Sequence, residues 1–135
     1  MQRRLSNTAD VKFFVLDYNK VMVALKKYAK MAIARGARAV FLIGSLARGD
    51  YTAFSDADIV IIADDVPKRP IDRLVDFMDP LMPIDIDLMV YTTEEILKMA
   101  REKRKIISEI VKYGKLLAGD VTVLNDIKRY FEAGR

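Results

Sequence analysis

The chain contains no cysteine, no histidine and no tryptophan among its 135 residues. Without cysteine it cannot form a disulfide, a thiolate zinc site or a cysteine nucleophile. Without histidine it lacks the usual general base, the serine triad and most zinc or iron chemistry. Any chemistry of this chain must therefore use carboxylates, hydroxyls, amines and a hard metal ion.

Long hydrophobic runs are also missing. No apolar run approaches the length of about 18 residues that a membrane span needs, and the opening MQRRLSNTAD lacks the apolar stretch of a secretory signal. We therefore expect a cytoplasmic protein without membrane contact. The hydrophobic content of 52% still allows a core, and with no repeat or Gly/Ser linker we expect one domain over 1–135.

The charge balance is only modestly positive, with 23 Lys and Arg residues against 19 Asp and Glu residues. This excess permits a polyphosphate or nucleic-acid partner but does not require one. Many lysines and arginines without cysteine, histidine or tryptophan also suit a solvated, thermostable surface. We therefore do not expect nucleic acid as the partner.

Hydrophobic periodicity predicts helices alternating with short strands. Apolar residues at helical spacing indicate a helix over 17–35 that closes at Gly36. The preceding VKFFVL, at 11–16, fits either the first turns of this helix or an added strand. Two short aliphatic runs, 39–43 and 57–63, have the composition of strands covered by helices on both faces.

The second half of the chain continues this alternation. Its expected elements are a short helix bounded by prolines, a third strand, a long helix and a last amphipathic helix, at 71–78, 84–91, 92–119 and 121–131. Thr92 or Thr93 would cap the long helix, whose first turn carries two glutamates, as the helix dipole favours.

Two carboxylates stand at the mouth of the second strand. Asp56 and Asp58 are two residues apart, so their side chains leave the same face of a strand. Like charges this close repel, and a divalent Mg²⁺ or Mn²⁺ between them would compensate. Asp87 or Asp85, on one face of the next strand, would add a third carboxylate to a two-metal site. A lone Asp-x-Asp pattern also fits a purely structural role, in which Asp56 caps a strand or loop and Asp58 forms an ion pair with a lysine.

A second device lies in the same segment. Gly44 and Ser45 directly follow the first strand, where a glycine lets a phosphate approach the backbone. A short helix over 46–48 would present free N–H groups and the positive end of its dipole. A Gly-Ser pair alone is usually only a turn, but here it precedes the spaced carboxylates, so phosphate and metal ligands would converge.

The segment that contains these residues resembles the signature of a known protein family. Gly44-Ser45, ten residues and then Asp56-Ala57-Asp58 resemble the signature of the nucleotidyltransferase superfamily that includes DNA polymerase beta. The string GSLARGD…SDADIVII is similar to the minimal nucleotidyltransferases, and the resemblance covers about 20–118. It implies an α/β (α+β) palm with a small mixed sheet flanked by helices. It also implies Mg²⁺-dependent transfer of a nucleoside monophosphate from a nucleoside triphosphate, with release of pyrophosphate.

The resemblance further assigns roles to the carboxylates. Asp56 and Asp58 would bind two Mg²⁺ ions, with Mn²⁺ as a substitute, and Asp87 would complete the site and take the acceptor's proton. The context IDLMVYT favours Asp87 over Asp85 as the third carboxylate.

The phosphate loop also receives its roles from this resemblance. Gly44 and Ser45 would hold the triphosphate tail, and Ser55 would order the loop. Arg48 would either reach a phosphate or form a structural salt bridge.

The residues of the motif do not specify the acceptor of the nucleoside monophosphate. The resemblance implies an antitoxin paired with a helical HEPN ribonuclease toxin, in some cases transferring AMP from ATP to a toxin tyrosine. One alternative is a module that neutralises its partner by occlusion without catalysis. Another is nucleotidylation of RNA or a small molecule, which would use the basic segment 98–105. No aromatic residue interleaves those charges, so we read that segment first as a solvated face.

The N-terminal third suggests an assembly. If 11–35 is one helix, Phe13, Leu16, Val23 and Met31 fall outside its main apolar stripe, so it would be apolar on more than one face. We therefore expect a homo-oligomer or a hetero-oligomer with a helical partner.

Overall fold

The structure is a computed structural model that describes residues 17–52 and 54–133. The segment 11–16, for which a strand and a helix were both open, lies outside the described residues. The described chain forms a four-stranded sheet in the order β3-β2-β1-β4. Its strands are β1 (Ala39–Ile43), β2 (Ala57–Ile62), β3 (Ile86–Tyr91) and β4 (Lys115–Gly119).

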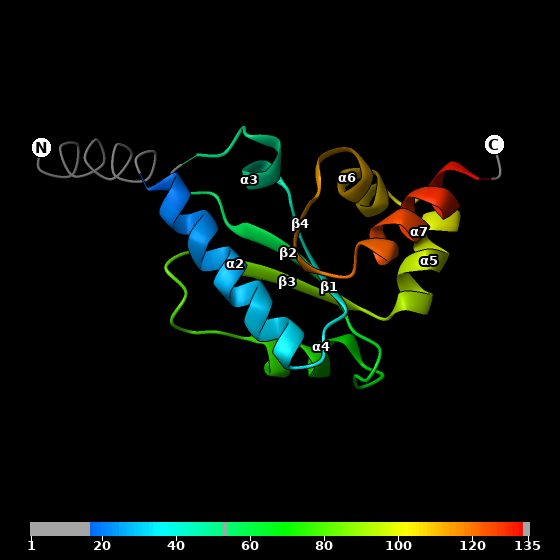
Figure 1. The fold of residues 1–135 in the computed structure, drawn as a ribbon, viewed down its shortest axis with the longest axis horizontal. Coiled ribbons are helices and arrows are strands. Elements are labelled where there is room, and N and C mark those ends of the chain that lie inside the picture. The colour runs from blue at the N-terminus through cyan, green and yellow to red at the C-terminus, as the bar shows by residue number, and fades with distance from the viewer. Residues whose placement is uncertain (1–16, 53, 134–135) are drawn as a thin grey trace, which may run out of the picture.

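Strand directions make this a mixed sheet. β1 runs antiparallel to both β2 and β4, whereas β2 and β3 are parallel. Helices cover both faces, with α2 on one side and α5, α6 and α7 on the other (Figure 1). The predicted mixed α/β fold, with a small sheet flanked by helices, is therefore confirmed.

The central strand β1 explains why the first aliphatic run needs no polar face. All five of its residues are buried, and they alternate between two separate clusters. Val40 and Leu42 pack with α2, whereas Phe41 and Ile43 pack with the helices of the other face. A strand with a core on each side must be apolar throughout.

The first described helix, α2 (Tyr18–Ala34), matches the expected span to within a residue at each end. Its stripe of Val21, Leu25, Tyr28, Ala29 and Ala32 is buried against the sheet. The chain then turns at Gly36, whose φ of 112° favours glycine. Val23 is 62% exposed on the outer side of the helix.

Short helical turns connect β2 to β3. The predicted helix over 71–78 is a single turn, α4 (Pro70–Arg73), followed by a 3₁₀ turn at Val75–Phe77. β3 begins at Ile86, two residues later than expected, although Ala57 already donates a backbone hydrogen bond to the carbonyl of Asp85 at 2.9 Å.

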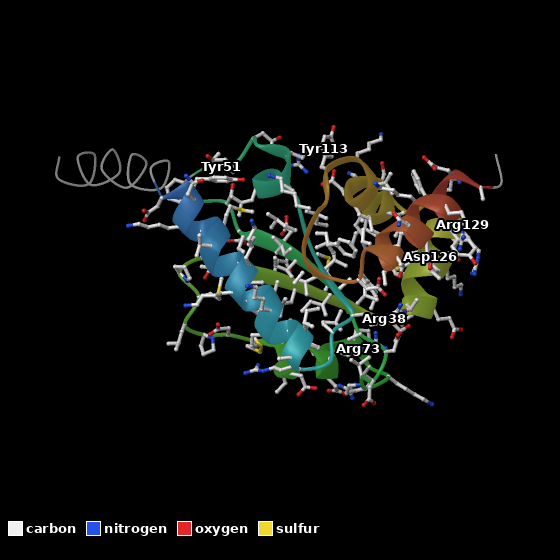
Figure 2. The ribbon with its side chains drawn as sticks, in the orientation of Figure 1. Arg38, Tyr51, Arg73, Tyr113, Asp126 and Arg129 are labelled. Carbon is white, nitrogen blue, oxygen red and sulfur yellow. The ribbon has the colours of Figure 1, made fainter. Side chains whose placement is uncertain are left out.

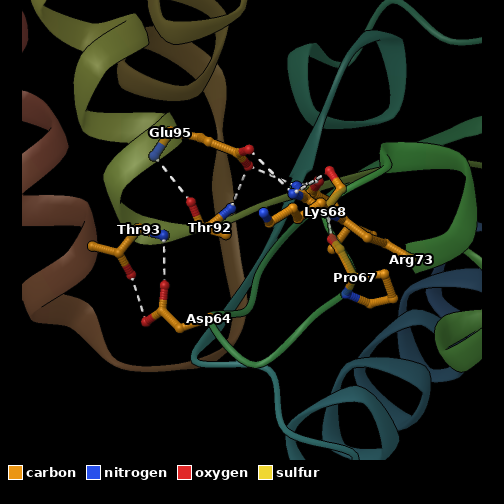
Figure 3. A network of polar contacts seen from close by, with 8 residues as sticks. Asp64, Pro67, Lys68, Arg73, Thr92, Thr93 and Glu95 are labelled. Atoms are coloured by element: carbon orange, nitrogen blue, oxygen red, sulfur yellow. Dashed lines mark hydrogen bonds and ion pairs between the residues drawn. The ribbon is translucent and has the colours of Figure 1, made fainter.

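A buried arginine joins these turns to the sheet. Arg73 is only 3% exposed, and its guanidinium donates to the carbonyls of Pro67, Lys68 and Val90 (Figure 3). It also forms a two-armed ion pair with Glu95, at 2.6 and 3.1 Å. Every guanidinium nitrogen is thereby paired, as burial of this charge requires.

The same network contains the start of α5 (Thr93–Arg101). The Thr92 hydroxyl accepts from the backbone N–H of Glu95, and the Glu95 carboxylate accepts from the backbone N–H of Thr92. This reciprocal capping box confirms the helix start predicted at Thr92 or Thr93. Asp64 adds two bonds to Thr93, so the network fastens the ends of β2 and β3 together.

The prediction of one long helix over 92–119 was wrong. The chain forms α5, then α6 (Lys105–Tyr113), and then the fourth strand β4. The break lies at Lys103, whose φ of 57° is left-handed and incompatible with a continuing helix. The Lys103 ammonium donates to the carbonyls of Phe131 and Ala133 at the end of α7, so a tertiary contact accompanies the break.

The last helix, α7 (Val121–Glu132), confirms the predicted amphipathic helix over 121–131. Asp120 caps it by accepting from the N–H of Thr122 at 2.9 Å. Within the described part of the chain, no helix has both the length and the apolar content needed to cross a bilayer.

Candidate active site

A cleft of about 650 Å³ opens between one face of the sheet, α3 (Ser45–Arg48) and α6. Its lining comes from strands β1 to β3 and from those two helices, and comprises Ile43, Arg48, Asp58, Asp87, Met89, Lys105, Ile106, Glu109 and Tyr113. This volume lies within the range of small-molecule sites, which is roughly 300 to 1,000 Å³.

Two carboxylates lie side by side on the floor of this cleft. Asp58 is paired with Ile43 across the β1–β2 ladder and with Asp87 across the parallel β2–β3 ladder. The three residues therefore form one row across the sheet. Burial raises the pKa of Asp58, and the charges of Asp87 and Asp56 raise it further, against the opposing effect of Arg48.

The other two predicted acidic residues are placed differently. Asp56 is exposed just before β2 and is not part of the cleft lining, although its charge acts on Asp58. Asp85 lies just before β3 and lines a separate hollow of about 170 Å³, together with Phe77 and Met82. Asp87, and not Asp85, therefore shares the cleft with Asp58, while their roles as metal ligands stay predictions.

Gly44 allows the loop after β1 to lie directly against the carboxylate of Asp58. Its φ of 76° is left-handed, and a Cβ built on it would stand 2.1 Å from Asp58 Oδ2. No side chain fits there without displacing the carboxylate. Immediately afterwards α3 begins at Ser45, one residue earlier than predicted, so the helix start and the carboxylate row meet at this glycine.

The two serines of the segment are hydrogen-bonded to each other. The Ser45 hydroxyl donates to the Ser55 hydroxyl at 3.0 Å, and the Ser55 hydroxyl accepts from the backbone N–H of Thr52 at 2.8 Å. Ser55 thus joins the start of the loop to its end. Contact of Ser45 with a triphosphate stays a prediction.

Arg48 forms ion pairs on both sides. Its Nη1 donates to Glu109 Oε1 on α6 at 2.6 Å, and its Nε donates to Asp50 Oδ2 at 3.3 Å. Of the two roles considered for Arg48, the salt bridge is present in the structure. A phosphate contact stays a prediction.

Sequence reasoning did not identify α6 as a wall of the cleft, although it singled out the basic segment 98–105, which ends at Lys105. Lys105, Ile106, Glu109 and Tyr113 all line it, at spacings that place them on one face of a helix. A helix assumed to continue from Thr93 to Gly119 has no reason to turn back over the carboxylates. Placing the break at Lys103 would have brought this face to notice.

The donor chemistry of the cleft fits Mg²⁺ or Mn²⁺, which prefer carboxylate oxygens beside phosphate. Asp58 and Asp87 supply such oxygens on adjacent strands in register. Across residues 17–52 and 54–133, however, no three acidic side chains are arranged to hold a metal ion as they stand. Burial first, and then the charges of Asp87 and Asp56, raise the pKa of Asp58, so a cation beside this carboxylate would favour its charged form.

The chain resembles one protein family in sequence and several solved structures in fold. The nucleotidyltransferase domain family matches residues 25–130. No curated protein matches the chain. The crystal structure of a candidate nucleotidyltransferase from Sulfolobus solfataricus has a TM-score of 0.50 and 20% identity, over 76% of this chain and 83% of that one.

Two further solved structures come from toxin–antitoxin systems. A toxin–antitoxin complex with AMP-PNP has a TM-score of 0.50 and 22% identity, over 76% of this chain and 86% of that one. A mutant of the toxin–antitoxin MntA-HpeT has a TM-score of 0.47 and 20% identity, over 84% of this chain and 86% of that one. For the two structures with a TM-score of 0.50, at 20% and 22% identity, the likeness shows the fold alone.

Proposed function

Because this chain belongs to the nucleotidyltransferase domain family, we propose that it transfers AMP from ATP to a tyrosine hydroxyl of a helical HEPN-type protein, acting as its antitoxin. The observation that carries the proposal is the row of Asp58 and Asp87 in a cleft beside Gly44. Two adjacent carboxylates and a phosphate-compatible loop are the parts that phosphoryl-type transfer requires.

In the proposed reaction the tyrosine oxygen forms a bond to the α-phosphorus of ATP. The bond from that phosphorus to the β-phosphate oxygen breaks, and pyrophosphate leaves. Asp87 accepts the phenolic proton, while Gly44 and Ser45 hold the triphosphate beside the start of α3. Arg48 contributes positive charge next to the transferred groups.

Mg²⁺, when bound, would neutralise phosphate charge and orient the reacting oxygens. Asp58 and Asp87 would hold it, and Asp56 would join them from the exposed position before β2. The raised pKa of Asp58 supports this role, because a carboxylate that is partly buried and lies near two other carboxylates is stabilised in its charged form by a cation.

The shape of the sheet supports acceptance of a protein substrate. β3 is an edge strand of the sheet and carries Asp87, so the acceptor side of the cleft borders an unpaired strand edge among the described elements. At the far end of that edge Arg73 of α4 donates to the carbonyl of Val90, so a partner would have to approach near Asp87. One neighbour of the same fold is itself a toxin–antitoxin complex solved with AMP-PNP, which motivates ATP as donor and a toxin as acceptor.

The test is transfer of label from α-³²P-ATP. The purified chain, Mg²⁺ and a lysate of its source cells should yield one labelled protein with AMP on a tyrosine. Asp56→Ala, Asp58→Ala and the double variant should each lose transfer by similar factors, since residues acting as one unit are not additive. Their circular dichroism should match that of the wild type.

The other outcomes separate the alternatives. Label in RNA or in a small molecule would replace the protein acceptor. A partner that binds stoichiometrically by light scattering, without label and with equal affinity for the Asp58→Ala variant, would favour neutralisation by occlusion. If Asp58→Ala kept near-normal turnover with Mg²⁺, the assignment of the carboxylates would be wrong.

A further inference from the structure

The cleft has a charged part and an apolar part. Asp58, Asp87, Arg48, Lys105 and Glu109 supply charge, and the remaining lining residues are Ile43, Met89, Ile106 and Tyr113. A site for a bare anion or metal would need no apolar wall of this kind. A ligand with a polar end and a flat apolar end, such as a nucleoside triphosphate, matches both parts.

Tyr113 is the unusual member of the apolar part. It is 45% exposed, and its ring belongs to neither of the two hydrophobic clusters of the core. In the part of the chain that the structure describes, its hydroxyl has no hydrogen-bond partner. A large aromatic side chain exposed on a cleft wall is typical of a ligand contact.

The position of Tyr113 relative to the carboxylate row indicates on which side of the row a base would bind. It is the last residue of α6, and β4 begins two residues later with Lys115, which pairs with Leu42 of β1. The row of Ile43, Asp58 and Asp87 runs from β1 to β3. Tyr113 therefore lies toward the β4 side of the row, and Asp87 lies toward the opposite, open edge.

The same end of α6 lies beside the phosphate loop. Glu109, one turn before Tyr113, is bonded to Arg48 of α3, and Figure 2 shows Tyr113 at the end of α6 nearest α3. A triphosphate at Gly44 and Ser45 would thus lie between Tyr113 on one side and Asp87 on the other. If the acceptor approaches from the β3 edge, the nucleoside must bind in the part of the cleft that Tyr113 lines.

We infer that Tyr113 stacks against the nucleobase of the bound nucleoside triphosphate and so supplies binding energy that a bare polyphosphate cannot obtain. This inference rests on the proposed function, because it takes a nucleoside triphosphate as the ligand of the cleft. Stacking uses the ring face and does not need the hydroxyl. The inference therefore predicts that affinity for the nucleotide depends on the aromatic ring of residue 113 and not on its hydroxyl.

The experiment compares two ligands in the presence of Mg²⁺. α,β-Methylene-ATP carries the base but cannot be transferred at its α-phosphorus, and inorganic tripolyphosphate carries no base. Isothermal titration calorimetry would measure both with the wild type, Tyr113→Ala and Tyr113→Phe. Leu81→Ala, at an exposed residue outside the cleft lining, serves as the control for removal of a surface apolar side chain.

Tyr113→Ala should bind α,β-methylene-ATP about tenfold more weakly, as loss of one aromatic stacking contact implies. Its affinity for tripolyphosphate should stay within about twofold of the wild type on the same reasoning. Tyr113→Phe and Leu81→Ala should leave both affinities unchanged. Unaltered thermal unfolding of Tyr113→Ala would show that the fold is intact.

Two results would overturn the inference while leaving the proposed function in place. One is equal binding of α,β-methylene-ATP by the wild type and Tyr113→Ala. The other is an equal loss for both ligands, which would make Tyr113 a support of the phosphate loop. A wild type that binds neither ligand would overturn the proposed function as well.

Discussion

Arg48 on α3 and Glu109 on α6 are joined by a 2.6 Å ion pair at the side of the cleft. The guanidinium also contacts Asp50, and its charge opposes the rise in the pKa of Asp58. The charge of Arg48 therefore acts on three carboxylates, those of Glu109, Asp50 and Asp58. An incoming triphosphate would compete with Glu109 for Arg48 and would also be repelled by the glutamate's charge.

Removing Glu109 should therefore strengthen phosphate binding. Glu109→Gln should bind Mg²⁺-tripolyphosphate about threefold more tightly, and Arg48→Ala about fivefold more weakly, magnitudes expected for partly exposed charges. Calorimetry at low salt would measure both. Glu102→Gln, the same charge change at a surface ion pair with Arg104, is the control. Weaker binding by Glu109→Gln would instead mean that the glutamate is needed to hold Arg48 in position.

The two aspartates near the start of β3 should differ sharply in their effect. Asp87→Asn should abolish transfer because Asp87 shares the cleft with Asp58. Asp85→Asn should lower kcat/KM less than about tenfold, or roughly 1.4 kcal/mol. Initial rates at saturating Mg²⁺ would rank them. The reverse order would move the third carboxylate to Asp85.

Gly44→Ala should eliminate the site with little damage to the sheet. The added Cβ would clash with the Asp58 carboxylate, and the alanine would also have to adopt a left-handed φ. We expect transfer to fall by at least about a hundredfold, since small misplacements at a reacting centre cost that much. Gly36→Ala, with nothing within 4 Å of its Cβ but a similarly positive φ, separates backbone strain from the clash. Equal losses in both variants would argue against the contact with Asp58.

Glu95→Gln should weaken the fold at neutral pH by about 1 to 2 kcal/mol, because buried Arg73 loses its ion-pair partner. The Glu95 side chain is 42% exposed, which keeps this below the cost of a fully buried pair. Urea unfolding would measure the effect, with exposed Glu94→Gln on the same helical turn as the control.

This effect should depend on pH with a defined sign. The hydrogen bond from Arg73 lowers the pKa of Glu95 in the folded chain. The ion pair therefore stabilises the fold fully above the ordinary glutamate pKa of about 4.3, and the stabilisation is lost as the pH falls through the lower folded value. The difference between wild type and Glu95→Gln should be largest near pH 7 and vanish in strong acid. A constant difference across this range would exclude the ion pair as its cause.

The sequence was most informative where a local pattern coincides with the tertiary environment. The aliphatic run 39–43 became β1 with the expected limits, because burial on both faces leaves a continuous apolar signal. The closeness of Asp58 and Asp87 followed from expecting their strands to be neighbours, and β2 and β3 do pair in register. The position of Gly44 directly after β1 is also local, whereas its contact with Asp58 depends on the pairing of Ile43 with Asp58 across the sheet.

The outer wall of the cleft could not be read in this way. Residues 92–113 have continuous helical periodicity, so nothing local marks the change of direction at Lys103. Lys103 contacts carbonyls about 30 residues away, at the end of α7. The strand over 115–119 is short and apolar, and only its pairing with β1 distinguishes it from helix.

The turn at Lys103 decides more than the path of a helix. A single helix from Thr93 to Gly119 would extend about 40 Å and would carry Glu109 and Tyr113 away from the carboxylates. The reactive groups and the wall that faces them are thus encoded separately, the first in the sheet and the second in a three-residue joint. Lengthening or shortening that joint would leave a chain with every signature residue and no enclosed cleft. Homology inferred from the signature alone would not distinguish such a chain from an enzyme.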